Sequence, residues 1–251
     1  MNELAFPRTS LPLVARPFFD GVNKTISPND AMYSGNQIHY FGVGASALSN
    51  ILHAVGVTES NPSRILDFGC GAGRVTRWLH TAFPDAAIEG CDIRKTDVEF
   101  VAKMFGGRTW ISGSDVAKLN PPSTYDLIWV GSVFTHLSKE VSIQLLDKLV
   151  SWLNPYGVLI FTSHGRYAAS IGPGSYGIDD QWCRVKEDFD RSQFGYADYS
   201  ATPGYGISLT PLPWWASLVT SRANLRLVSM TERAWDSHQD VTSVQFLSDV
   251  Q

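Results

Sequence analysis

Short apolar runs alternate with stretches of helical character along the middle of the chain. The apolar runs have the length of strands and cover 64–68, 87–93, 109–112, 125–130 and 158–162. The stretches between them predict helices over 74–83, 96–105 and 139–153. The run at 158–162 is almost continuously apolar, which is typical of a parallel strand buried on both faces. This alternation predicts an α/β fold with a mostly parallel sheet.

The two ends of the chain have different patterns. Residues 1–35 are rich in proline and polar turn formers and predict an irregular arm. Apolar residues recur at three- and four-residue intervals over 37–55, which predicts an amphipathic helix. Near the other end, 225–232 and 241–247 predict two strands. The link of eight residues between them is too short for a crossover helix, so these strands should be antiparallel neighbours.

The segment at about 165–216 loses this regular pattern. It holds ten of the thirty aromatic residues, mixed with glycines. Long loops within a compact domain are usually lids or binding loops. We interpret the segment as an acceptor-binding insertion with a short helix over 179–189, followed by a helix near 213–222. The alternative is a capping subdomain whose aromatic residues form a small core of their own.

A glycine-dense turn follows the first predicted strand. Gly69, Gly71 and Gly73 alternate with Cys70 and Ala72 just before a predicted helix. Such a turn brings the backbone close to a ligand, and the helix that follows presents free N–H groups to it. A dinucleotide-binding turn has the spacing G-x-G-x-x-G, and here the third glycine comes one residue early. A P-loop is excluded because no Lys-Ser or Lys-Thr pair follows.

An acidic residue at the strand end, Asp67, followed by G-x-G-x-G, resembles the first motif of the class I S-adenosylmethionine-dependent methyltransferases. The resemblance covers about 60–165, with four motifs in order. It implies a doubly wound, seven-stranded, mostly parallel sheet of order 3-2-1-4-5-7-6. An antiparallel hairpin would close this sheet, with helices on both faces and the aromatic-rich insertion after strand 5. The cofactor would be S-adenosylmethionine, which leaves as S-adenosylhomocysteine.

The resemblance also implies where each part of the cofactor lies. Methionine is expected near the glycine turn and Ser132, ribose at Asp92, and adenine at Asp115. Asp92 comes nineteen positions after Gly73, close to the spacing of a ribose-binding carboxylate. The alternatives are a helix N-cap for Asp92 and an ordinary turn for Asp115. The full set of predicted cofactor-binding residues is Asp67, Gly69, Cys70, Gly71, Gly73, Asp92, Ile93, Ser114, Asp115, Val116, Gly131 and Ser132.

Three histidines are predicted at the same edge of the sheet. His136 follows the fourth strand, His164 follows the fifth, and His238 lies in the closing hairpin. An imidazole is the natural base for a hydroxyl acceptor near neutral pH. His136 is the first candidate, then His238, then His164, and a packing role is the alternative for each.

The predicted reaction is O-methylation of a sugar or another small-molecule hydroxyl. The predicted acceptor contacts are Tyr40, Trp182 and Tyr205, and core packing is the alternative for Tyr40.

Composition narrows the function further. The net charge of −4 disfavours nucleic-acid binding, and the oligomeric state stays open. Cys70, Cys91 and Cys183 have no C-x-x-C spacing, so we expect reduced thiols, no metal site and a cytoplasmic protein. Neither a signal peptide nor a membrane span is expected.

Length and motif content leave a few alternatives. The length of 251 residues suits one α/β domain with additions, or two small domains. We expect an arm and helix at 1–59 and a methyltransferase domain at 60–251. An aminopropyl transferase of the same fold is disfavoured because 131–136 contains no acid to hold an amine. A non-catalytic protein that binds S-adenosylmethionine is the other alternative.

Overall fold

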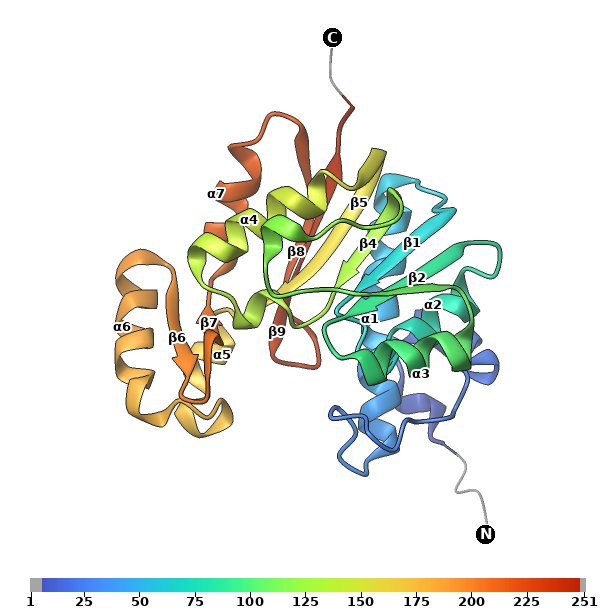
Figure 1. Cartoon of the computed structure of the whole chain (residues 1–251), viewed down its shortest axis with the longest axis horizontal. Helices are drawn as coiled ribbons and strands as arrows, with labels where there is room; N and C mark the ends of the chain where they lie inside the picture. The colour runs from blue at the N-terminus through green and yellow to red at the C-terminus, as the bar shows by residue number, and fades with distance from the viewer. Residues whose placement is uncertain (1–5, 249–251) are drawn as a thin grey trace.

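A computed structural model describes residues 6–248 (Figure 1). Its main sheet has seven strands in the order β3-β2-β1-β4-β5-β9-β8. The strands of this sheet are β1 Arg64–Phe68, β2 Ala87–Asp92, β3 Arg108–Ile111, β4 Tyr125–Val130, β5 Leu153–Ser163, β8 Leu225–Trp235 and β9 Gln239–Phe246. The helices are α1 Gln37–Thr58, α2 Thr76–Ala82, α3 Lys95–Phe105, α4 Lys139–Val150, α5 Arg166–Ser170, α6 Trp182–Ser192 and α7 Leu212–Thr220.

The strand order confirms the predicted fold. β1, β2, β3, β4 and β5 are parallel, and β9 is antiparallel to both β5 and β8. The closing strands are longer than predicted, so only 236–238 separate them instead of eight residues. β9 begins with two polar residues, Gln239 and Asp240, which are buried in the structure. Because polar residues are not typical of a buried strand, the sequence placed the start of this strand two residues too late.

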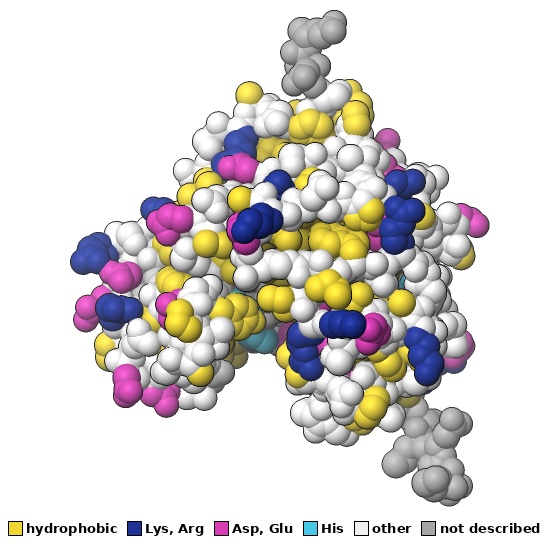
Figure 2. All heavy atoms as spheres, viewed as in Figure 1, with side chains coloured by type: hydrophobic (Ala, Val, Ile, Leu, Met, Phe, Trp, Pro, Cys, Tyr) yellow, Lys and Arg dark blue, Asp and Glu magenta, His cyan; other side chains and the backbone are white. Residues whose placement is uncertain are grey.

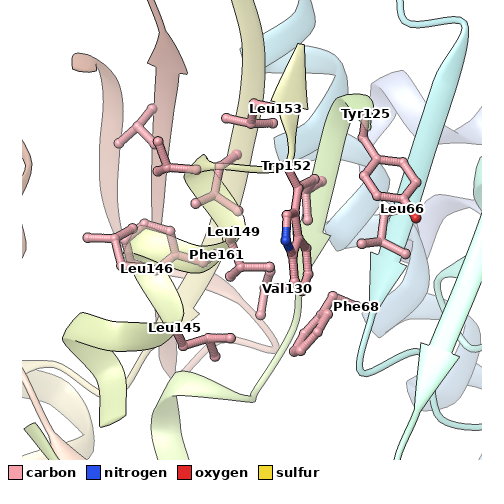
Figure 3. Close-up of a cluster of buried hydrophobic side chains, with 14 of the residues drawn as sticks. Leu66, Phe68, Tyr125, Val130, Leu145, Leu146, Leu149, Trp152, Leu153 and Phe161 are labelled. Carbon is pink, nitrogen blue, oxygen red and sulfur yellow. The ribbon is translucent and has the colours of Figure 1, made fainter. Parts of the chain in front are cut away.

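Two apolar layers hold the sheet between helices. On one face, α1 and α2 pack on Ile65, Leu127 and Ile160. On the other face, α4 and α7 pack on Leu66, Val130 and Phe161 and their neighbours (Figure 3). Both faces are therefore closed to solvent, which explains why the strands are apolar without alternation.

Helix α1 begins at its cap Asn36, whose side chain accepts a hydrogen bond from the His39 N–H at 3.1 Å. By length and composition alone, this helix is apolar enough to cross a membrane. Its apolar residues have partners in the fold, because one side packs on the sheet and another on the arm through Tyr40, Phe41 and Leu48.

The insertion after β5 is more regular than predicted. It contains α5, α6 and a separate two-stranded sheet of β6 (Gly195–Tyr199) and β7 (Thr202–Leu209), at the left of Figure 1. The predicted helix over 179–189 lies at Trp182–Ser192 instead. The sequence had obscured the hairpin because proline and glycine interrupt β7. A small apolar core unites these elements, as in the alternative of a capping subdomain.

Candidate active site

The carboxyl ends of the parallel strands meet at one edge of the sheet, and most predicted site residues lie there. Strand order reverses between β1 and β4, which is where open α/β sheets bind their ligands. Figure 2 shows a hollow between the insertion and the rest of the molecule, with a histidine at its bottom.

The three glycines of the turn have different structural roles. All three have positive φ, at 75°, 51° and 81° for Gly69, Gly71 and Gly73. A Cβ at Gly73 would lie 2.5 Å from the Phe105 ring, and one at Gly69 would lie 2.7 Å from Val133. A Cβ at Gly71 would meet nothing within 4 Å. Gly71 therefore borders open space, and the other two permit close packing.

Asp92 ends β2 directly beside this turn. Its two carboxylate oxygens accept hydrogen bonds from the Gly71 and Arg94 N–H groups, both at 2.9 Å. Each oxygen keeps a second lone pair for a ligand hydroxyl. The next side chain, Ile93, is 60% exposed although it is apolar. A carboxylate and an uncovered apolar surface therefore lie side by side.

Asp67 lies behind the turn. Its side chain is 1% exposed and accepts a hydrogen bond from Thr76 Oγ1 at 2.6 Å. Burial raises the pKa of Asp67 to about 7. Asp67 therefore ties the end of β1 to the start of α2 and supports the turn from within. Cys70 is also buried, at 6% exposure.

The predicted adenine residues lie at the outer rim of this edge. Asp115 is exposed, caps a short 3₁₀ helix through the Ala117 N–H and pairs with Lys118 at 2.9 Å. Ser114 is exposed as well, and Val116 is partly buried. The geometry of Asp115 is that of a turn, and its free oxygen lone pairs still suit a donor group on a ligand.

Arg74 is a residue that the motif did not single out as a ligand contact. Its guanidinium lies 5.3 Å from the centre of the Trp235 ring. Burial lowers the pKa of Arg74, and the carboxylate of Asp236 opposes this effect. None of the ion pairs among residues 6–248 involves Arg74. A partly buried cation without a carboxylate partner is therefore available to an anionic group.

A second arginine, Arg77, joins the arm to the glycine turn. It is 1% exposed and donates to the carbonyls of Asn23 and Thr25, both at 3.0 Å. It also donates to the Tyr40 hydroxyl at 3.2 Å, which in turn donates to Asp30 at 2.6 Å. Tyr40 is 1% exposed. The structure thus gives Tyr40 packing and hydrogen-bond partners in the core, the alternative to an acceptor contact.

Ser132 stands in a closed ring of hydrogen bonds after β4. Its N–H donates to Thr162 Oγ1 at 2.8 Å, and Thr162 Oγ1 donates to Gln239 Oε1 at 2.6 Å. Gln239 Nε2 completes the ring by donating to Ser132 Oγ at 3.0 Å. This ring holds Ser132 at a φ of 59°, a conformation that non-glycine residues rarely adopt. Gly131 precedes it and lies close to the Trp129 and Trp235 rings.

His136 follows on the same loop and is fixed by the insertion. Its Nδ1 lies 2.8 Å from the Gly206 carbonyl oxygen, and its ring stacks on Tyr205 with centroids 4.6 Å apart. A carbonyl can only accept, so Nδ1 carries the proton and Nε2 has a lone pair. Burial lowers the pKa of His136, so the ring is neutral near pH 7.

The other two histidines lie together, as their ring centroids are 5.7 Å apart. His164 is 3% exposed, and burial, more than the nearby His238 and His136, lowers its pKa to about 3. His238 is partly buried, and its Nδ1 contacts the Asp236 carbonyl oxygen at 2.8 Å. The three predicted histidines therefore lie near one another, and a backbone carbonyl contacts Nδ1 of both His136 and His238.

The two aromatic acceptor contacts predicted in the insertion differ. Tyr205 is 43% exposed, and the charge of Asp92 contributes, after burial, to a raised pKa of its hydroxyl. Tyr205 therefore lies close enough to Asp92 to be affected by its charge. Trp182 is only 7% exposed and stacks on Tyr176 within the core of the insertion. Core packing accounts for Trp182 without an acceptor.

Residues 65–157 match the sequence model of a family described as a methyltransferase domain. Residues 65–157 therefore form a methyltransferase domain. Over the region that they share, this domain is 36% identical to a malonyl-[acyl-carrier protein] O-methyltransferase of Halalkalibacterium halodurans, with 43% of the chain and 41% of the relative covered. It is 35% identical to a trans-aconitate 2-methyltransferase of Methylobacterium nodulans, with 39% and 37% covered. The chain thus matches about two fifths of the length of these relatives.

Solved methyltransferase structures share the fold over nearly the whole chain. The plantazolicin methyltransferase BpumL, in complex with SAH, superposes with a TM-score of 0.60 at 15% identity over 94% of each chain. The N-methyltransferase NodS of Bradyrhizobium japonicum, also with SAH, gives 0.54 at 14% identity over 93% of this chain and 98% of NodS. The fold therefore extends to the closing hairpin, beyond the matched family region.

The donor set of the methyltransferase domain suits S-adenosylmethionine. The cofactor has a carboxylate, a ribose diol and an adenine ring. The edge offers a cation at Arg74, a carboxylate at Asp92, an exposed apolar side chain at Ile93 and open space at Gly71. Among residues 6–248, no group of three metal-ligating side chains occurs.

Proposed function

We propose that this protein transfers a methyl group from S-adenosylmethionine to a hydroxyl oxygen of a small molecule, such as a sugar or a hydroxylated aromatic compound. The observation that carries this proposal is the fixed tautomer of His136. Its Nδ1–H is held by Gly206, and its Nε2 lone pair has no partner among the described side chains. Such an imidazole can take the proton of an alcohol, whereas carboxylate or thiolate acceptors do not need a base.

Three residues on the cofactor side would hold the donor. Arg74 binds the carboxylate of the methionine part, and Asp92 accepts hydrogen bonds from the ribose hydroxyls. Ile93 packs on the adenine ring. These assignments follow the placement of one cation, one carboxylate and one exposed apolar side chain around the turn.

S-adenosylmethionine supplies a methyl group on a positively charged sulfur, and S-adenosylhomocysteine is released when the carbon–sulfur bond breaks. The acceptor oxygen forms the new bond to the methyl carbon, and its proton passes to His136 Nε2. Alignment of the two reacting atoms provides most of the acceleration in such a displacement. The His136–Tyr205 stack and the Ser132 ring hold the base still for this purpose.

The proposal is tested by calorimetry followed by an acceptor screen. S-adenosylmethionine and S-adenosylhomocysteine should bind the purified protein, and release of S-adenosylhomocysteine should reveal turnover with sugars or phenols. Binding without release from any acceptor class would favour a non-catalytic role. Turnover confined to carboxylic acids or amines would contradict the assignment of a hydroxyl acceptor.

A further inference from the structure

Trp235 lies at the end of β8, where the closing hairpin turns, and neighbouring elements fix its ring. The residue is 2% exposed. Its Nε1 donates a hydrogen bond to the Val43 carbonyl of α1 at 3.0 Å. Its ring meets the Trp129 ring of β4 nearly at a right angle, with centroids 5.7 Å apart. The indole is therefore held in one orientation between α1 and β4.

The fixed indole contacts two residues of the cofactor edge. The Arg74 guanidinium lies over the ring, 5.3 Å from its centre. A Cβ at Gly131 would lie 3.0 Å from the same ring. The glycine turn after β1 and the loop after β4 therefore share one rigid neighbour, which comes from the far end of the chain.

An aromatic partner affects a cation differently from a carboxylate. A carboxylate would accept hydrogen bonds from the guanidinium N–H groups and so compete with the carboxylate of a ligand. A ring attracts the positive charge through its face and leaves the N–H groups at the edge of the guanidinium free. The residue after Trp235 is Asp236, and its carboxylate is paired with His39 Nε2 at 2.8 Å.

The N–H groups of Arg74 are accessible. Within residues 6–248, the Arg74 side chain makes no hydrogen bond or ion pair, and none of its nitrogen atoms is fully buried. A ligand can therefore reach these donors while the ring supports the guanidinium from one side.

We propose that Trp235 is a positioning residue for the amino-acid end of S-adenosylmethionine: its ring holds the Arg74 guanidinium in place and leaves the N–H groups free for the ligand carboxylate. This inference rests on the proposed function, in which Arg74 binds that carboxylate. A side chain that is ordered before binding loses less conformational entropy when the ligand arrives, so the ligand binds more tightly.

The test compares two ligands by calorimetry. 5′-Methylthioadenosine has the adenine, ribose and sulfur of S-adenosylhomocysteine but lacks the amino-acid end. Trp235→Leu should weaken S-adenosylhomocysteine binding about three- to tenfold and leave the affinity for 5′-methylthioadenosine within about twofold, because only the first ligand needs an ordered guanidinium. Trp235→Phe keeps an aromatic face and should bind S-adenosylhomocysteine within about twofold of the unaltered protein.

Trp215→Leu is the matched control. Trp215 is 0% exposed, but it packs on Phe134 and Phe161 on the other face of the sheet. Loss of this equally buried indole should leave the ratio of the two affinities unchanged.

A second measurement uses the unaltered protein and needs no folded variant of Trp235. The ring current of the indole should displace the Arg74 Nε–H proton upfield in the NMR spectrum, where this resonance is assigned from its loss in Arg74→Lys. S-adenosylhomocysteine should shift the resonance, and 5′-methylthioadenosine should not.

Three results would overturn the positioning role: equal weakening of both ligands in Trp235→Leu, as large a loss in Trp235→Phe as in Trp235→Leu, or an Arg74 proton without an upfield displacement. Arg74→Met separates this inference from the proposed function, because it should weaken S-adenosylhomocysteine alone, by about tenfold. If Arg74→Met leaves that affinity unchanged, the carboxylate assignment in the proposed function is wrong. A selective loss in Arg74→Met without one in Trp235→Leu refutes only the role of Trp235.

Discussion

The two halves of the proposed active site, one for the cofactor and one for the acceptor, are built in different ways. The cofactor half, which comprises the turn 67–74 with Asp92 and Ile93, relies on backbone geometry and on contacts between neighbouring elements. The acceptor half comprises His136, His164 and His238 with Tyr176 and Tyr205 of the insertion. It relies on side chains that the fold brings together from distant segments.

This difference has a physical basis. A backbone turn presents the same N–H groups and dipole whatever acceptor is used, so it suits a ligand that does not change. Side chains on an insertion can be exchanged without disturbing the sheet, so they suit an acceptor that differs between related enzymes. Substitutions in the two halves should therefore affect different steps.

The largest effect is expected at the base. His136→Gln should lower turnover about 10²–10⁴-fold, the usual contribution of a general base. Because burial lowers the pKa of His136 in the ligand-free protein below its ordinary 6.5, the acid limb of the kcat/KM profile should lie below pH 6.5 in the unaltered enzyme. Steady-state kinetics with an acceptor from the screen measures both.

The control for His136 is cofactor affinity, which should stay near that of the unaltered protein. If His136→Gln turns over normally, the acceptor half contains no base at this position.

The next effect is expected at the open glycine. Gly71→Val should weaken S-adenosylhomocysteine binding at least about a hundredfold, or about 2.7 kcal/mol. The substitution fills the free space and strains a φ of 51°. Gly35→Val is the matched control, because Gly35 is exposed, also has a positive φ of 87°, and a Cβ there also meets no atom within 4 Å. Calorimetry that gives equal affinities for both variants would place the ligand elsewhere.

A smaller effect is expected for the ribose contact. Asp92→Ala should weaken S-adenosylhomocysteine binding about tenfold, or about 1.4 kcal/mol. It should leave kcat less affected than His136→Gln does. Asp85→Ala, at an exposed turn before β2, serves as the control. Unchanged calorimetric affinity in Asp92→Ala would refute the ribose assignment.

The smallest effect concerns stability. The free energy of unfolding should depend on pH with opposite signs for one buried group in each half, Asp67 and His164. Asp67 has a raised pKa of about 7. Its contribution to the free energy of unfolding is therefore fully present below pH 3.8 and is lost as pH rises through 7. His164 has a lowered pKa of about 3, so its contribution is present above pH 6.5 and is lost as pH falls toward 3. In urea unfolding, each variant's difference in unfolding free energy from the unaltered protein is measured against pH. This difference should change with pH in opposite directions for Asp67→Asn and His164→Phe. Between the two pKa values of each group, this difference should change by at most about 1.4 kcal/mol per pH unit.

Matching slopes for these two variants would contradict the burial of one of the two groups. A variant at an exposed position, such as Asp85→Asn, should leave the unfolding profile unchanged at every pH.

The same contrast explains what could be predicted from the sequence. The glycine turn depends on a local pattern and was predicted from it, and the sheet order was predicted from the resemblance that this turn helps to carry. The contact between His136 and Gly206 spans 70 residues, and the one between Ser132 and Gln239 spans 107. No local pattern records such contacts. Arg74 was not predicted as a candidate ligand contact, because its lack of an ion-pair partner becomes visible only in three dimensions. The β6–β7 hairpin was not predicted because glycine and proline hide its alternation.

A co-crystal structure with S-adenosylhomocysteine would show directly whether the glycine turn and the histidines belong to one site. We expect the carboxylate at Arg74 beside the glycine turn, the ribose at Asp92, and the sulfur on the side that faces His136 Nε2 across the hollow. A sulfur atom that points away from the three histidines, or a turn that binds no part of the nucleoside, would contradict it.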